Sequence, residues 1–198
     1  VSQTIAPATA TTINITGTGF VAIPIVDFIN ASTGATTRAN TVSLTSATQL
    51  SVNLTLASGN YFVRIENPDG NAARSTNNII TASTAPSFST GAGSLGTVSA
   101  GESVSLSVAA SSDSNVTIAE TTSVLTSNAN TPAATMNLTL SGSPATSATY
   151  NITGTAPSPT GETTYNFTLS ATDVESQVVT RDFSITVSVG INNSGQFN

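Results

Sequence analysis

The sequence has no cysteine, histidine, lysine or tryptophan among its 198 residues. Missing cysteine excludes a disulfide framework and a cysteine nucleophile. Missing histidine excludes an imidazole general base and a zinc site with the usual nitrogen and sulfur ligands. Only 7% of the residues are charged, against about a quarter in an ordinary soluble protein. Most common catalytic mechanisms therefore lose a participant.

Positive charge is also scarce. The sequence has four basic residues, all of them arginines that stand far apart along the chain, and its formal net charge is −6. A phosphate-binding stripe needs clustered lysine and arginine, so we expect no nucleic-acid partner. Pro24 and Asp27 interrupt the longest apolar run, Val21 to Ile29. This run is shorter than the roughly 18 to 20 residues that span a bilayer, so we expect no membrane insertion.

Serine and threonine together supply 65 positions, and 38% of the residues are hydrophobic. The hydrophobic residues alternate with polar ones, which predicts half-buried strands with an apolar inner face. Examples are Ile13 and Ile15; Leu50, Val52, Leu54 and Leu56; Val104, Leu106 and Val108; Tyr165, Phe167 and Leu169; and Phe183, Ile185 and Val187. Around residues 61–65 the pattern leaves open which alternate set is buried. The sequence predicts an all-β fold.

Turn residues separate these runs at intervals of about ten residues, a spacing typical of antiparallel sandwiches. The sharpest signal is Asn67-Pro68-Asp69-Gly70. Proline presets φ at the second turn position and glycine can take a positive φ. We therefore expect the strand at 61–66 to fold back on one that begins near Ala72.

Small residues and Pro86 interrupt the strand pattern near residue 85. We therefore expect one domain at 1–82, a linker at 83–87 and a second domain at 88–190. The polar segment 191–198 is expected to be a tail or a link to a further module. A start at Val1 rather than at methionine is typical of a processed chain or of a piece of a longer one.

The first half resembles the IPT/TIG family of immunoglobulin-like domains. Two segments carry the resemblance, Ile13-Asn14-Ile15-Thr16-Gly17-Thr18-Gly19-Phe20 and the hairpin from Gly59 to Gly70 that contains Tyr61-Phe62-Val63-Arg64. The resemblance covers most of residues 6–81 and implies an immunoglobulin-like β-sandwich.

The second half is similar to the cadherin-like immunoglobulin-fold modules of phage and bacterial surface proteins. The matching segments are 95–98 with 101–104, 152–157, 165–173 and 183–187. This resemblance covers about residues 86–190. It implies two tandem immunoglobulin-like β-sandwiches and a virion or extracellular setting, but no chemistry by itself.

Asp173, Glu175 and Asp182 are the acidic residues to consider for calcium, which takes six to eight oxygen ligands. The alternative reading is structural, with Asp173 capping a turn and Arg181 balancing Glu175 or Asp182. The further acidic motifs of a cadherin site are missing, so we favour the structural reading and expect no metal and no cofactor.

Two aromatic residues stand outside the strand pattern. Phe88 borders the linker and Phe197 lies in the tail. We expect them to be candidate contacts with a neighbouring module.

We expect no catalytic residues, because the ten acids are scattered and paired carboxylates need a shared cleft. The expected function is a non-enzymatic structural or adhesive module on a particle surface: a phage virion component such as a capsid decoration protein, fibre or tail appendage. The alternative is a bacterial extracellular surface protein, or spacer and accessory domains beside a carbohydrate-active module. The DNA-binding use of the IPT/TIG fold is disfavoured by the dispersed arginines.

The expected partners are other virion or surface proteins, in a homo-oligomer or symmetric assembly, and a host-surface glycan remains an alternative ligand. Edge strands without lysine lack the usual protection against edge pairing. Strand addition is therefore the expected mode of contact.

Overall fold

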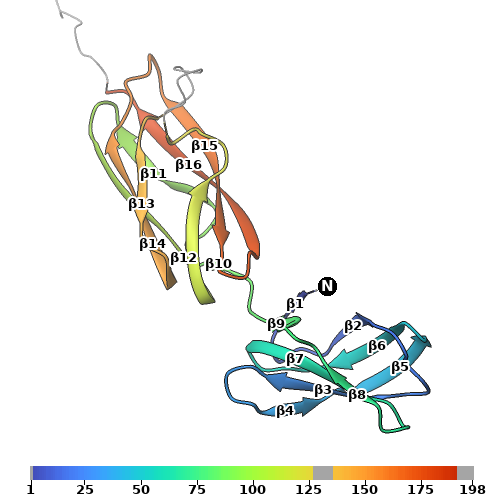
Figure 1. Ribbon diagram of the computed structural model, residues 1–198. Coiled ribbons are helices and arrows are strands. Elements are labelled where there is room, and N and C mark those ends of the chain that lie inside the picture. The colour runs from blue at the N-terminus through green and yellow to red at the C-terminus, as the bar shows by residue number, and fades with distance from the viewer. Residues whose placement is uncertain (1, 127–135, 191–198) are drawn as a thin grey trace, which may run out of the picture. The chain divides into compact units, whose positions relative to one another are not determined.

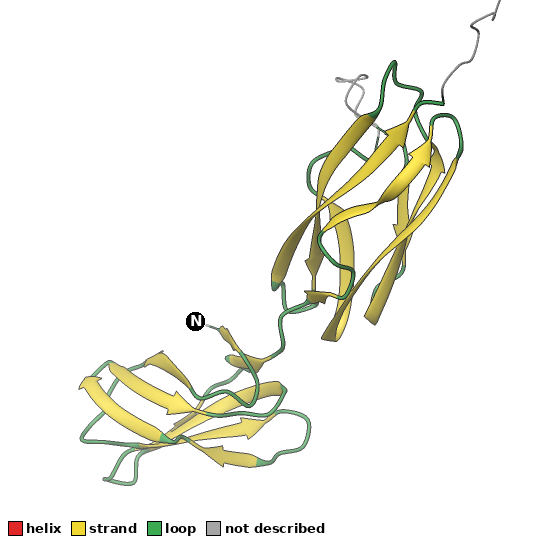
Figure 2. Ribbon diagram, turned by 180° about the vertical axis from the view of Figure 1, so that it is seen from behind, coloured by secondary structure: helices red, strands yellow, loops and turns green. Residues whose placement is uncertain are grey.

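The computed structural model describes residues 2–126 and 136–190. Every regular secondary-structure element among these residues is a β-strand, which confirms the predicted all-β fold class (Figure 1, Figure 2). The chain divides into two compact units, unit 1 at Val1–Thr84 and unit 2 at Ala85–Asn198. None of the described segments forms a helix with the length and apolarity needed to cross a bilayer.

Unit 1 contains two sheets. The first has the order β1-β9-β7-β3-β4, with β8 paired to β7, and the second has the order β2-β6-β5. The strands are β1 (Gln3–Ile5), β2 (Thr11–Thr16), β3 (Ile25–Asn30), β4 (Thr36–Arg38), β5 (Thr41–Ser46), β6 (Gln49–Leu54), β7 (Gly59–Glu66), β8 (Ala72–Arg74) and β9 (Ile80–Ala82).

The core of unit 1 lies between the two sheets and uses the alternate residues that the period of two predicts. It contains Ile13, Ile15, Val26, Phe28, Leu50, Val52, Leu54, Tyr61, Val63 and Ile80. In β7 the structure selects Tyr61 and Val63 for the core, which leaves Phe62 and Arg64 on the outer face. The predicted fold-back is confirmed, because β8 pairs antiparallel with β7 across the turn at 67–71.

Unit 2 has the strand order β11-β16-β15-β12-β14-β13, with β10 paired to β12. The strands are β10 (Ser87–Phe88), β11 (Gly93–Ser99), β12 (Ser103–Glu120), β13 (Thr139–Gly142), β14 (Ala145–Thr155), β15 (Thr163–Thr172) and β16 (Val178–Ser188). Ser87, placed in the linker from sequence, is already part of β10.

The long strand β12 connects the two layers of unit 2. Its residues 103–111 and Val116 pair with β14, with a register shift between Ser111 and Val116, and its last four residues pair with β15. Such an irregularity bends a strand and lets it change sheets. The core between the layers includes Val108, Ile118, Tyr150, Ile152, Phe167, Leu169, Phe183 and Ile185.

Glu120, the last residue of β12, holds the segment 121–126 in place. Its carboxylate accepts hydrogen bonds from the backbone N–H groups of Val124, Leu125 (2.9 Å) and Thr126 (3.1 Å), and from the Thr126 hydroxyl at 3.0 Å. This carboxylate therefore satisfies backbone donors that no neighbouring strand pairs.

Among the residues that the structure describes, each unit contains one parallel strand pair, which involves the last described strand of that unit. In unit 1, β1 runs parallel to β9, with Gln3 paired to Ile80 and Ile5 to Ala82. In unit 2, β11 runs parallel to β16 from Gly93 opposite Phe183 to Ser99 opposite Ser188. A strand near the start of each unit is thus bonded to the last strand described in that unit.

Candidate functional site

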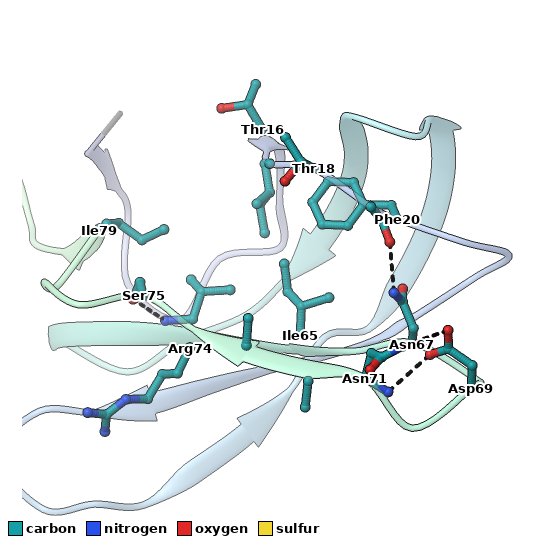
Figure 3. A pocket seen from close by; sticks show the side chains of 16 residues that line it. Thr16, Thr18, Phe20, Ile65, Asn67, Asp69, Asn71, Arg74, Ser75 and Ile79 are labelled. Atoms are coloured by element: carbon teal, nitrogen blue, oxygen red, sulfur yellow. Dashed lines mark hydrogen bonds between the residues drawn. The ribbon is translucent and has the colours of Figure 1, made fainter.

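A groove of about 540 Å³ opens between the free edge of β2 and the hairpin strand β8 in unit 1 (Figure 3). Its floor is apolar and includes the buried side chains of Ile15, Phe20 and Val63. Its rim carries hydroxyl and amide groups and the carboxylate of Asp69, whereas the side chain of Arg74 points away from the groove and lies over the Phe62 ring (Figure 3). The remaining lining residues are Thr16, Gly17, Thr18, Gly19, Ile65, Asn67, Asp69, Asn71, Ala72, Ala73, Arg74, Ser75 and Ile79.

The groove brings together the two motifs that the sequence singled out, and Asn67 joins them. The Asn67 side chain donates from Nδ2 to the carbonyl of Gly19 at 2.8 Å and accepts the N–H of Val21 at 3.3 Å. Gly17 is required for the same packing, because a Cβ there would lie 2.6 Å from Cζ of the Phe20 ring. The sequence found both motifs, but only the fold shows that they share a site.

Backbone groups border the groove on both sides. Ser75 donates its N–H to the carbonyl of Val63 on β7. Because successive residues of a strand direct their backbone groups to opposite sides, Ala72 and Arg74 direct theirs away from β7. On β2, Gly17 donates its N–H to Thr48 of the neighbouring turn, so the preceding groove residue Thr16 directs its backbone groups away from β6. An extended chain could therefore bond to either edge while its apolar side chains contact the floor. Such a site is suited to binding an extended chain.

We expect Asn67→Ala to loosen this end of unit 1, because the substitution removes both bonds that hold residues 19–21. The cost is about 1–2 kcal/mol in local stability, which corresponds to about five- to thirtyfold faster amide hydrogen exchange at 17–21. Asn78→Ala, at an exposed position of the same unit, serves as the control and should change exchange little. Equal exchange in the two variants would contradict the proposed tie.

A second feature of unit 1 was missed from sequence: a row of charges across the outer face of its larger sheet. Register places Arg38 of β4 opposite Asp27 of β3, Asp27 opposite Arg64 of β7, and Arg64 opposite Arg74 of β8. We call these four residues the arginine row. Three of the four arginines that are dispersed in sequence are thus neighbours in space.

Asp27 is the buried centre of the arginine row, with 6% of its surface exposed. It accepts Nε–H of Arg38 at 3.0 Å and a terminal N–H of Arg64 at 3.4 Å. A hydrogen bond and ion pair with Glu66 raises the pKa of Arg64 above its ordinary value, and Asp27 adds to the effect. Cross-strand pairing depends on register rather than on sequence distance. Sequence spacing alone therefore gave no sign of the row.

The three calcium candidates are held in separate hydrogen-bond arrangements. Asp173 is buried and accepts the backbone N–H of Gln177 at 2.7 Å and its side-chain Nε2 at 3.0 Å. Glu175 accepts the hydroxyl of Ser114, and Asp182 accepts that of Thr168 at 2.7 Å. Within residues 2–126 and 136–190, no three acidic side chains come together as a metal-binding group.

The structure corrects the expectation for Phe88. Its side chain is only 4% exposed and packs in the core of unit 2, edge-on to Phe183 with ring centroids 5.6 Å apart. Burial within its own unit excludes it as an exposed contact, because pairing of β10 with β12 turns the ring inward. Phe197 lies outside the described residues.

Arg181 also differs from the sequence expectation. Its guanidinium lies 5.5 Å from the centroid of the Phe88 ring and donates to the carbonyls of Phe88 at 3.1 Å and Thr90 at 2.7 Å. It therefore fixes the chain around β10 instead of balancing Glu175 or Asp182 across the hairpin. The sequence alone could not show that the backbone carbonyls of Phe88 and Thr90, about 90 residues earlier in the chain, are the acceptors for Arg181.

No family model and no curated protein matches the sequence. Among solved structures, a three-immunoglobulin-domain fragment of titin has a TM-score of 0.52 at 13% identity, and the match covers 94% of this chain and 62% of that fragment. Dpr2 domains Ig1–Ig2 in complex with DIP-Theta have a TM-score of 0.36 at 12% identity, covering 92% of this chain and 93% of that one.

The BIgI domain of the beta protein from S. agalactiae, bound to CEACAM1, has a TM-score of 0.35 at 26% identity, covering 49% of this chain and 90% of that domain. The TM-scores of the Dpr2 and BIgI matches are too low to support any conclusion, and the titin match, at 13% identity, concerns the fold alone. With the strand order and the titin fragment together, the fold is that of tandem immunoglobulin-like β-sandwiches.

Proposed function

We propose that this chain is a non-enzymatic structural and adhesive module that carries load on a surface and binds a partner protein there. Unit 1 is proposed to be of the IPT/TIG type, which is supported by the packing of its two motifs around Asn67. The proposed location is a phage virion, as a decoration protein, fibre or tail appendage. The alternative is a bacterial cell surface, where the two units would be spacers or accessory domains.

The observation that carries the structural role is the parallel pairing of β1 with β9 and of β11 with β16. In a parallel pair, the N-terminal end of the first strand and the C-terminal end of the last strand lie at opposite ends of the hydrogen-bonded ladder. Tension along the chain therefore slides the two strands past each other and loads their hydrogen bonds together, in unit 2 once the two-residue strand β10 has separated from β12. A hairpin pulled at its open end would instead lose its bonds one at a time.

The groove of unit 1 supports the adhesive role. It offers an apolar floor and unpaired strand edges, the features that allow a partner to add an extended strand. Its volume of about 540 Å³ also falls within the range of small-ligand sites. The outward backbone groups of β8 favour a peptide chain, since they offer a repeating pattern of donors and acceptors.

The mechanical role is tested by pulling single chains with Val98→Pro and Thr97→Pro on β11, and with Val98→Ala, which measures the loss of the packing of Val98 against the core without the loss of its N–H. Ala100 donates its N–H to Ser188, so the N–H of Val98 points in the same direction, toward β16, and that of Thr97 points away. We expect Val98→Pro to lower the unfolding force of unit 2 clearly and Thr97→Pro to leave it nearly unchanged. The equilibrium cost of the lost bond is only about 1 kcal/mol.

Equal unfolding forces for the two proline variants would contradict the mechanical role, because the ladder would then not be the element that resists. Location is a separate question. Fixed stoichiometric copies on purified virions support the virion proposal, whereas attachment to bacterial cells without virions supports the alternative.

A further inference from the structure

The charges of this chain are divided unevenly between its units. Unit 1 has three arginines and three carboxylates, so its formal charge is zero. Unit 2 has one arginine and seven carboxylates and therefore carries the whole net charge of −6. Four of its carboxylates, Glu102, Asp113, Glu162 and Asp182, are on exposed residues. The scarce positive charge of unit 1 is in turn gathered in the arginine row.

The arginine row has bonding capacity left for an external anion. Its arginines outnumber Asp27 and the neighbouring Glu66 by one. Asp27 accepts the Nε–H of Arg38, whose side chain is 64% exposed. A guanidinium has five N–H donors, so the two terminal nitrogens of Arg38 can donate to another acceptor. Arg74 stacks 4.6 Å from the centroid of the Phe62 ring, which supports its guanidinium without neutralising it. Both ends of the row can therefore bind further carboxylates.

The surface around the row is suited to contact with a protein. Ile25, which alternates with Asp27 on the same face of β3, is 40% exposed, and Ile29 and Phe62 are half-buried. Apolar side chains next to guanidinium groups are typical of protein interfaces, in which arginine and aromatic residues are enriched. A bound surface would strengthen the ion pairs by excluding water.

We propose that the arginine row binds the acidic unit 2 of a second copy of this chain. The row and unit 2 are different surfaces, so the contact joins chains head to tail and leaves a free row and a free unit 2 at the ends. This inference extends the proposed function by naming a partner and a surface. It is independent of the mechanical test, which uses single chains.

The test is sedimentation velocity of the full chain over a range of concentrations, at about 0.01 M and about 1 M NaCl, where the Debye lengths are about 30 Å and 3 Å. We expect self-association at low salt, weakened at least about tenfold at high salt. The double variant Arg38→Gln with Arg74→Gln should remain monomeric at both salt concentrations.

The control is Ser43→Glu with Thr45→Glu, two exposed positions on β5 that change the net charge by the same amount. We expect the control to associate at low salt nearly as well as the wild type. Three results would overturn the proposal: a wild-type monomer at low salt, equal loss of association in both double variants, or a monomer whose arginine row binds only an added polyanion such as heparin or polyglutamate. Circular dichroism confirms that each variant is folded.

Discussion

Replacing Phe88 by alanine is expected to lower the free energy of unfolding of unit 2 by about 3–5 kcal/mol, the usual cost of truncating a buried phenylalanine. The ring is 4% exposed, meets Phe183 edge-on and lies below the guanidinium of Arg181. β10 has only two residues, so this side chain is the principal anchor of that strand. Loss of the ring would leave a cavity in the core of unit 2 and would loosen the segment whose carbonyls, those of Phe88 and Thr90, Arg181 binds.

The measurement is urea denaturation followed by tyrosine fluorescence in a Tyr61→Phe background, because the remaining tyrosines, Tyr150 and Tyr165, both belong to unit 2. Phe88→Leu keeps an apolar side chain of similar volume and should cost less than about 1.5 kcal/mol. Unchanged stability of Phe88→Ala together with altered binding would restore the interpretation of Phe88 as a surface contact.

The second large effect is expected at Glu120. Burial acts to raise the pKa of this carboxyl, but the hydrogen bonds from the N–H groups of Leu125, Thr126 and Val124 outweigh it and lower the pKa below its ordinary value of 4.5. The carboxylate form is thus favoured in the folded state. Glu120→Gln keeps the shape but removes the charge and turns an amide donor toward backbone donors. We expect a loss of about 1–2 kcal/mol, at the lower end for charged hydrogen bonds because solvent reaches the group.

The same lowered pKa gives a pH dependence with a definite sign. A group whose pKa is lower in the folded state stabilises fully above its unfolded pKa, and this contribution disappears as the pH falls through the folded pKa. Wild-type unit 2 should therefore lose stability below about pH 4.5, whereas Glu120→Gln should lack this part of the loss. Denaturation at a series of pH values, with Glu162→Gln as the exposed control, measures the difference. Parallel pH profiles for wild type and Glu120→Gln would contradict the capping role.

Local patterns in the sequence were sufficient for the strands and for one turn. Ile13, Ile15 and the alternate residues of β6 lie in the core as their period of two predicts. The turn at Asn67 forms because proline and glycine restrict the backbone there. These features depend on residues close together in the chain, so the sequence contains the information that specifies them.

Other features depend on contacts between distant residues, which no local pattern specifies. Alternation at 61–65 was compatible with either face, and packing against the second sheet selected Tyr61 and Val63. Phe88 could not be placed because its burial depends on the pairing of β10 with β12. The 18-residue length of β12 and its passage between layers also depend on partners on both sides.

The sequence by itself determined the fold class and the absence of histidine, cysteine and lysine side chains, because composition and alternation are properties of the chain alone. Tertiary structure decided where binding can occur. It joined the motifs at Gly17 and Asn67 into one groove, and its strand register aligned Arg38, Arg64 and Arg74 beside the buried Asp27. The physical reason is that cross-strand neighbours are set by register and by packing of the two sheets.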